Sequence, residues 1–148
     1  MRIAWLTTIV WTLTWPAALW AQSGDFRGVL LGGALVDASG TAVAAGDELD
    51  GGEELRVGPE AASIYLWSGA EDAPAAEAVV YLAPSAQLRL TGTPGAIQGL
   101  AVAGGSAAVR LSSSAGGPAL PVSIAPGGAP WARLTRGVLW ISADASGG

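Results

Sequence analysis

Glycine and proline interrupt this chain so often that a long regular helix has no room in most of it. The sequence contains 22 glycines and 9 prolines in 148 residues. Glycine adopts positive φ readily, whereas proline fixes φ and lacks a backbone N–H, so both residues favour tight turns. Clusters with turn chemistry occur at residues 37–40, 50–52, 58–59, 84–85, 92–95, 104–105, 116–118 and 126–128. We therefore expect short strands joined by tight turns.

Between these clusters, apolar side chains alternate with other residues. Four segments place one polar side chain between two apolar ones, and in three of them the polar residue is arginine: residues 55–57, 88–90, 109–111 and 122–124. A period of two is typical of a strand with one buried face and one solvated face. Further strand candidates are residues 28–31, 34–36, 41–44, 63–67, 79–82, 97–102, 131–134 and 138–142.

These strands predict an all-β domain over residues 22–142, arranged as a β-sandwich, a small barrel or a β-solenoid-like stack. One helix is conceivable at residues 72–81, where Asp72 could act as N-cap and Pro74 fits the first turn. We favour a loop that runs into a strand, because residues 79–81 are strand formers. Residues 143–148 are small and polar, and we expect a disordered tail there.

The amino-terminal segment has the order of features found in secretory signal peptides. Arg2 precedes an apolar run at residues 3–15, and Pro16 and an alanine-rich stretch follow. We expect residues 1–21 to be removed by cleavage after Ala21, which makes Gln22 the new amino terminus. The alternative is an uncleaved membrane anchor, since a span needs about 20 apolar residues. We expect a periplasmic or extracellular protein that contacts the membrane only transiently, through the signal peptide.

The net charge and the missing residue types exclude several classes of function. Removal of Arg2 leaves six arginines against twelve acidic residues, a net charge of −6, which makes nucleic acid a poor partner. The chain has no His, no Cys and no Lys, so it lacks the residues for a Ser-His-Asp triad, a Cys nucleophile, a Ser-Lys dyad or the usual zinc and copper sites. We therefore expect a protein that is not an enzyme and carries no cofactor.

Acidic residues cluster at Asp47, Asp50, Glu53 and Glu54, around two glycines. Carboxylates bunched in this way could bind calcium in an exported protein, although the spacing does not match an EF-hand loop. A pair of these carboxylates could also serve a glycoside hydrolase, which is the remote alternative function. The interpretation that we favour is two adjacent turns with solvated acids that keep neighbouring chains apart.

Aromatic residues provide a candidate for a binding surface. Tyr65 and Trp67 lie on the same face of their predicted strand, opposite Ile64 and Leu66, so we expect one pair to be buried and the other to be more exposed. If they are exposed together, Tyr65, Trp67 and Trp131 could stack on sugar rings or contact a protein. We favour the simpler arrangement in which both faces are covered.

Residues 28–90 resemble the FecR-type periplasmic β domain. The resemblance rests on a Gly-Val opening strand, a short hairpin, Ala-Gly-Asp-Glu-Leu at residues 45–49 with two glycines after it, the alternating strand at residues 63–67, and Leu-Ala-Pro-Ser-Ala-Gln-Leu-Arg-Leu at residues 82–90. It implies an exported β domain. The loop at residues 68–74 is longer than the Asp-Gly-Ser turn usual in that family. We do not expect the anti-sigma segment or the membrane helix that precede this domain in FecR regulators.

Together these features predict an exported, non-catalytic module of the cell envelope that acts through protein or glycan contacts. The alternative is a carbohydrate-binding or adhesin-like surface module, which requires Tyr65, Trp67 or Trp131 to be exposed together.

The first prediction concerns export. The exported protein should begin near Gln22 and be soluble outside the cytoplasm, because residues 1–21 have signal-peptide character. Intact-mass measurement of the protein recovered from the periplasm or medium checks this. A full-length chain that still starts at Met1 and remains in the inner membrane would contradict the prediction.

Overall fold

The computed structural model describes residues 25–70, 72–113, 118–124 and 132–143, and these residues form strands and no helix. The predicted all-β class is confirmed. The strands are β1 (Arg27–Gly32), β2 (Leu35–Val36), β3 (Ala42–Val43), β4 (Glu48–Leu49), β5 (Glu54–Val57), β6 (Ala62–Ala70), β7 (Ala73–Leu82), β8 (Gln87–Thr93), β9 (Ala96–Ser113), β10 (Leu120–Ile124), β11 (Ala132–Leu134) and β12 (Gly137–Ala143).

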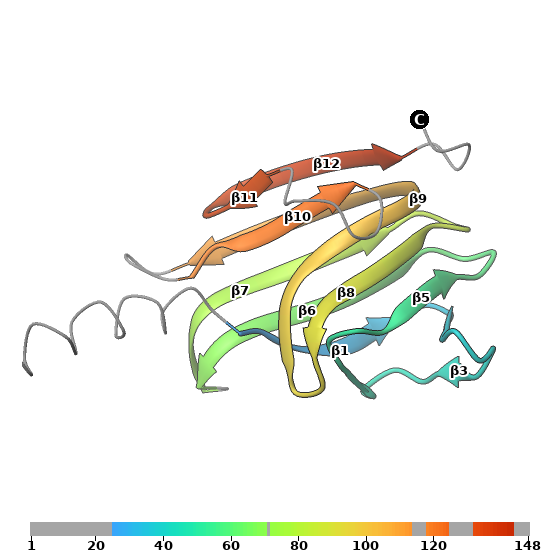
Figure 1. Cartoon of the computed structure of the whole chain (residues 1–148), viewed down its shortest axis with the longest axis horizontal. Coiled ribbons are helices and arrows are strands. Elements are labelled where there is room, and N and C mark those ends of the chain that lie inside the picture. Colours follow the sequence, from blue (N-terminus) through green and yellow to red (C-terminus); the bar gives the residue numbers. More distant parts are fainter. Residues whose placement is uncertain (1–24, 71, 114–117, 125–131, 144–148) are drawn as a thin grey trace, which may run out of the picture.

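All the strands belong to one sheet that is organised around β9. β7 and β8 pair antiparallel with successive parts of β9, and β10 and β12 also pair with it, β10 in parallel. We call β2, β3, β5, β8, β10, β11 and the start of β9 the first half, and β1, β4, β6, β7, β12 and the end of β9 the second half. Figure 1 shows β9 curving from one half into the other. The pairing is largely antiparallel, so among the expected arrangements the strands do not form a solenoid of stacked parallel rungs.

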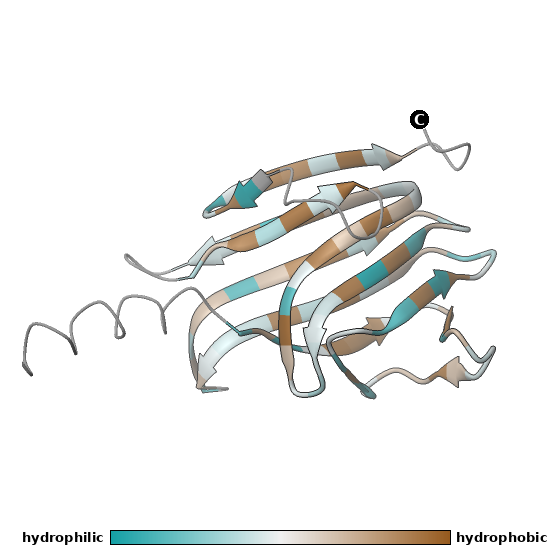
Figure 2. Cartoon of the chain, viewed as in Figure 1, coloured by the Kyte–Doolittle hydropathy of each residue, from teal (hydrophilic) through white to brown (hydrophobic). Residues whose placement is uncertain are grey.

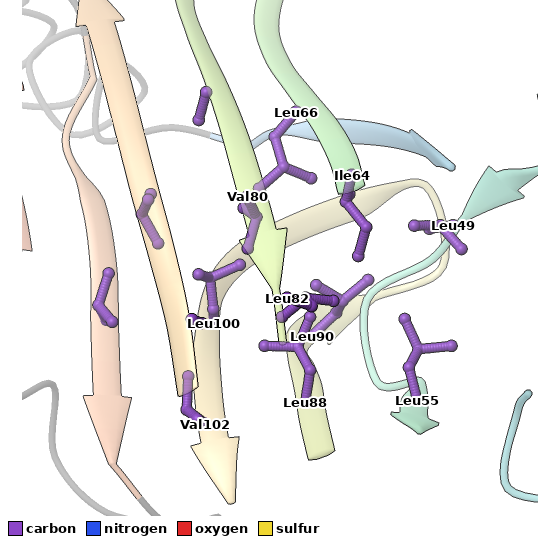
Figure 3. Packing of buried hydrophobic residues seen from close by; sticks show 14 of the residues in the cluster. Leu49, Leu55, Ile64, Leu66, Val80, Leu82, Leu88, Leu90, Leu100 and Val102 are labelled. Atoms are coloured by element: carbon purple, nitrogen blue, oxygen red, sulfur yellow. The ribbon is translucent and has the colours of Figure 1, made fainter. Parts of the chain in front are cut away.

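The hydrophobic core lies between the two halves. Inward side chains come from both: Leu55, Leu88, Leu90 and Leu100 from the first half, and Ile64, Leu66, Val80 and Leu82 from the second, each at most 2% exposed. These side chains converge in Figure 3. Burial of one Leu or Ile side chain stabilises a fold by roughly 1.5–3 kcal/mol. The chain has no cysteine, so this core takes the place of disulfides as the source of stability.

The alternating pattern places polar side chains outward, as Figure 2 shows along β5 and β8. Arg56 and Arg110 are exposed and Arg89 is half-buried, as the alternation predicted. Ser123 is an exception, because it is only 8% exposed and its hydroxyl lies 3.5 Å from the Leu100 carbonyl oxygen that accepts its hydrogen bond. The polar position of β10 therefore faces protein and not water.

Three expectations about element boundaries are corrected. The loop expected before residue 79 is strand, because β7 already begins at Ala73 and pairs with β6, which also removes the helix alternative. Ala143 was placed in the tail but ends β12 and is 7% exposed. Residues 104–105 were expected to form a turn but lie inside β9. Residues 1–24, the rest of the tail and Trp131 lie outside the described residues. The described residues contain no helix that is long and apolar enough to span a membrane.

Gly105 explains why β9 continues where a turn was expected. Its φ is +79°, and a Cβ atom there would lie 2.8 Å from the Ala86 Cα in the turn between β7 and β8. A glycine inside a strand marks a bend or a close backbone approach, and both occur here. The glycine pair therefore lets one strand follow β8 and then β7 around the edge of the core.

The second prediction uses this bend. Gly105→Ala should destabilise the fold more than Gly95→Ala, because both sites have positive φ but a Cβ at Gly95 meets nothing within 4 Å. Positive φ alone costs an alanine on the order of 1 kcal/mol, or roughly 4 °C in Tm. Thermal unfolding followed by circular dichroism measures both losses. Equal losses would show that contact with Ala86 does not constrain β9.

Candidate functional site

The outer face of the second half carries a hollow between two aromatic side chains. We use the term outer face for the side of β1, β6, β7, β9 and β12 that points away from the core. In the sheet, Tyr81 of β7 pairs with Ala108 of β9, and Ala108 pairs with Trp140 of β12. Tyr81 is 52% exposed and Trp140 is 78% exposed, whereas Ala108 is buried. The result is a hollow of about 250 Å³, the Tyr81–Trp140 hollow.

Sheet geometry sets the width of this hollow. Neighbouring strands lie about 4.8 Å apart, so the backbones of Tyr81 and Trp140 stand about 10 Å apart across β9. The methyl group of Ala108 leaves the space between them unfilled. Most of the lining is apolar, and Ser106 contributes a hydroxyl 3.4 Å from that of Ser142. A flat apolar group with polar edges fits such a site.

A second aromatic group lies on the same face. Tyr65 stacks on Trp67 with ring centroids 5.5 Å apart, and the Arg27 guanidinium lies 5.7 Å from the Trp67 ring centroid. The Tyr65 hydroxyl donates a hydrogen bond of 2.5 Å to Glu77, and Arg27 also forms a 3.1 Å ion pair with Glu48. These contacts make the group a packed unit whose side chains hold one another in place.

This packing determines how much of Tyr65 and Trp67, two residues of the predicted aromatic surface, is exposed. Ile64 and Leu66 are in the core, and Tyr65 and Trp67 lie together on the opposite face. Tyr65 is half-buried, but Trp67 is only 5% exposed, and its buried Nε1 has no hydrogen-bond partner among the described residues. Trp67 therefore supports the outer face and offers little ring surface to a ligand. The alternation showed which side these residues occupy but not how far neighbours cover them.

Two of the four acidic residues, Asp50 and Glu53, form hydrogen bonds that hold the β4–β5 turn in place. The Asp50 carboxylate accepts a 3.0 Å hydrogen bond from the Gly95 backbone N–H, which lies 45 positions along the chain in the turn between β8 and β9. Glu53 accepts a 3.3 Å hydrogen bond from the Asp50 backbone N–H. Gly51 lies between them and packs so tightly that a Cβ there would lie 2.5 Å from the backbone nitrogen of Thr93. Asp50 therefore links the β4–β5 turn to the hairpin of β8 and β9, and Glu53 closes the β4–β5 turn itself.

The other two acidic residues have separate partners. Asp47 accepts a 2.9 Å hydrogen bond from the Ala44 backbone N–H inside its own turn, and Glu54 lies 4.0 Å from Arg89. Across the parts of the chain that the structure describes, no three Asp, Glu, His or Cys side chains are grouped to hold a metal ion. Asp47, Asp50, Glu53 and Glu54 are therefore neighbours in sequence that act at different places. Calcium binding, the less favoured interpretation of these residues, stays an untested alternative.

A further hollow of about 190 Å³ lies over β5 and β8, where Arg56, Arg89 and Glu54 contribute to its lining. Glycosidases need two carboxylates on either side of the scissile bond. This hollow has one carboxylate in its lining, and the Tyr81–Trp140 hollow has none among its lining residues. The carboxylate-based hydrolase alternative therefore finds no support at either hollow.

Asp37 is the described group whose pKa clearly departs from its usual value. The Ser39 hydroxyl donates to its carboxylate at 2.6 Å and the Thr41 backbone N–H at 2.9 Å, and these bonds lower the pKa of Asp37. The carboxylate closes the turn between β2 and β3, which lie at the opposite end of the strand order from β6, β1 and β4. Its charge supports a turn and does not contribute to the Tyr81–Trp140 hollow.

Comparison of the whole chain with protein-family models, curated proteins and solved structures finds no match in any of the three. The resemblance to FecR-type domains stays a prediction that rests on the residues quoted for it. Sequence reasoning missed Tyr81 and Trp140 as site residues. Their strands were predicted, but nothing in the linear pattern shows that Ala108 lies between them.

The third prediction tests the acidic turns. Asp50→Ala should lower the free energy of unfolding by about 1 kcal/mol, because the Gly95 backbone N–H in the turn between β8 and β9 loses its side-chain acceptor. Asp47→Ala, which breaks a bond inside one turn, should cost less. Thermal scans should give the same loss of stability for each variant in millimolar calcium and in chelator. If calcium raises the melting temperature of the wild type but not of Asp50→Ala, the acids hold an ion.

Proposed function

We propose that this protein is an exported, non-catalytic binding module of the cell envelope that binds neutral glycans in the Tyr81–Trp140 hollow. The observation that carries this proposal is the pair of exposed aromatic side chains on either side of the small, buried Ala108. A sugar ring has apolar C–H faces and polar edges. Aromatic rings offer a matching apolar surface, and the Ser106 hydroxyl, which donates to Ser142, can accept a hydrogen bond from a sugar hydroxyl.

The charge distribution of the outer face favours a neutral ligand. Arg27 and Arg110 are balanced by Glu48 and Glu77, all exposed on this face. The expected mature chain has a net charge of −6, which disfavours polyanions at long range. The apolar lining of the hollow supports stacking as the main source of affinity.

Binding without turnover is supported by the residue inventory. The chain has no His, Cys or Lys, and the described lining of the hollow has no carboxylate. A bound sugar would therefore meet no general acid or base that titrates near neutral pH. The signal-peptide character of residues 1–21 supports a periplasmic or extracellular location, where envelope glycans are available.

A protein partner is the second candidate. Leu31 and Val138 of the second half are 50% and 54% exposed, so exposed apolar side chains also lie outside the hollow. Larger exposed apolar patches often mark protein contacts. Substitution of Val138 separates the two candidates, because this side chain is exposed but does not line the hollow.

The fourth prediction addresses glycan binding. Trp140→Ala and Tyr81→Ala should each weaken binding of short neutral oligosaccharides by about tenfold, or about 1.4 kcal/mol, because one stacking surface is removed. Val138→Ala is the matched control, since it is exposed on the same strand outside the hollow. Calorimetric titration or chemical-shift titration with oligosaccharides of glucose and of N-acetylglucosamine measures the effect.

Two outcomes would contradict the proposal. Absence of binding by the wild type to every neutral oligosaccharide would remove the ligand class. An equal loss in Val138→Ala would show that the contact is not confined to the hollow, and would favour the protein partner.

A further inference from the structure

β12 is an edge strand of unusual length for this sheet. It pairs with β9 in unbroken register over seven residues, from Gly137 opposite Leu111 to Ala143 opposite Gly105. Within the described part of the chain, no strand pairs with its other side. The backbone N–H and C=O groups on that side therefore lack strand partners, and such a row is a template for another strand.

The side chains of β12 do nothing to block pairing. The strand reads Gly-Val-Leu-Trp-Ile-Ser-Ala, without a charge, a proline or a bulge. Proteins usually protect edges with lysine, proline, a bulge or a very short strand. The other edge strands follow that last rule, because β3 and β4 have two residues each and β11 has three. β12 is the described edge that is left open.

We propose that two copies of this chain form a dimer by antiparallel pairing of β12 with β12, around a two-fold axis at Trp140. An antiparallel pair of identical strands is self-complementary, so it satisfies the symmetry of a homodimer. Trp140 is the middle residue of the seven, and pairing centred there engages the whole strand. Val138 then lies opposite Ser142 of the partner subunit, and every shifted register leaves residues unpaired.

Side-chain burial favours the same register. Residues directly opposite in an antiparallel pair have Cβ atoms about 5 Å apart on the same face. The two Trp140 rings, each 78% exposed in the single chain, would therefore pack beside one another on the outer face. On the inner side, Leu139 is half-buried and Ile141 is 4% exposed, so pairing extends the core layer across the axis.

The dimer brings two binding hollows into one row. Across the joined sheet the order becomes Tyr81, Ala108, Trp140, then the partner's Trp140, the partner's Ala108 and the partner's Tyr81. The two alanine floors stand three strand spacings apart, about 14 Å. Two such sites on one face suit a linear polymer, since the second contact forms within the same complex. This consequence rests on the proposed glycan function, whereas the dimer itself does not.

Disulfide trapping tests the dimer, because the chain has no cysteine of its own. Trp140→Cys places each thiol opposite its own copy, and mild oxidation should give a covalent dimer in high yield. In Val138→Cys the two thiols stand about 13 Å apart along the strand, beyond the roughly 7 Å between Cα atoms that a disulfide allows. That variant should stay monomeric on oxidation. A mixture of Val138→Cys with Ser142→Cys should crosslink and keeps Trp140 in place.

Sedimentation of the mature wild type should show a dimer, and Trp140→Lys should raise the dimer Kd by about tenfold or more, because like charges then lie directly opposite. Circular dichroism controls for folding of each variant. A monomeric wild type at the highest soluble concentration overturns the dimer, as does equal self-crosslinking of Val138→Cys and Trp140→Cys. A monomer that still binds oligosaccharide through Trp140 refutes the dimer alone, and a dimer that binds none refutes the glycan function alone.

Discussion

The structure depends on β9, which pairs with β8 up to Gly104 and with β7 from Ala107 onward. Because β7 and β8 are joined by a short turn, this strand must bend where they meet, and Gly105 allows the bend by taking positive φ against Ala86. The bend brings the inward leucines of the two halves face to face. A straight β9 would leave each half with one apolar face in water, so hydrophobic burial and this backbone conformation support one another.

Register is what turns separate residues into a candidate site. β7, β9 and β12 place Tyr81, Ala108 and Trp140 in one row across the sheet. A slip of one residue in β12 would turn Trp140 toward the core and Ile141 toward water, which the burial of Ile141 opposes. The same core that stabilises the fold therefore also fixes the outer face. The size of the hollow follows from Ala108, whose small side chain leaves the two aromatic rings apart.

Acidic residues hold parts of the fold together, whereas aromatic residues line the hollow. Asp50 and Glu53 fasten turns at one end, and Glu77 and Glu48 hold the Tyr65 and Arg27 side chains around Trp67. These carboxylates act through hydrogen bonds and ion pairs inside the fold. The hollow is left with aromatic rings, small apolar side chains and a serine hydroxyl, which is the chemistry of a binding surface.

Local pattern by itself determined the all-β class, most of the strands, and the opposite faces of Ile64 and Tyr65, because alternation and turn residues act within a few positions. Local pattern could not distinguish glycines that end a strand in a turn from glycines that bend a continuous strand. Residues 104–105 were therefore predicted as a turn, although they lie inside β9. Only the tertiary structure decided that Trp67 is covered and that Tyr81 and Trp140 lie on either side of Ala108. Those neighbours are about 30 positions apart, and strand pairing, which no local periodicity encodes, brings them together.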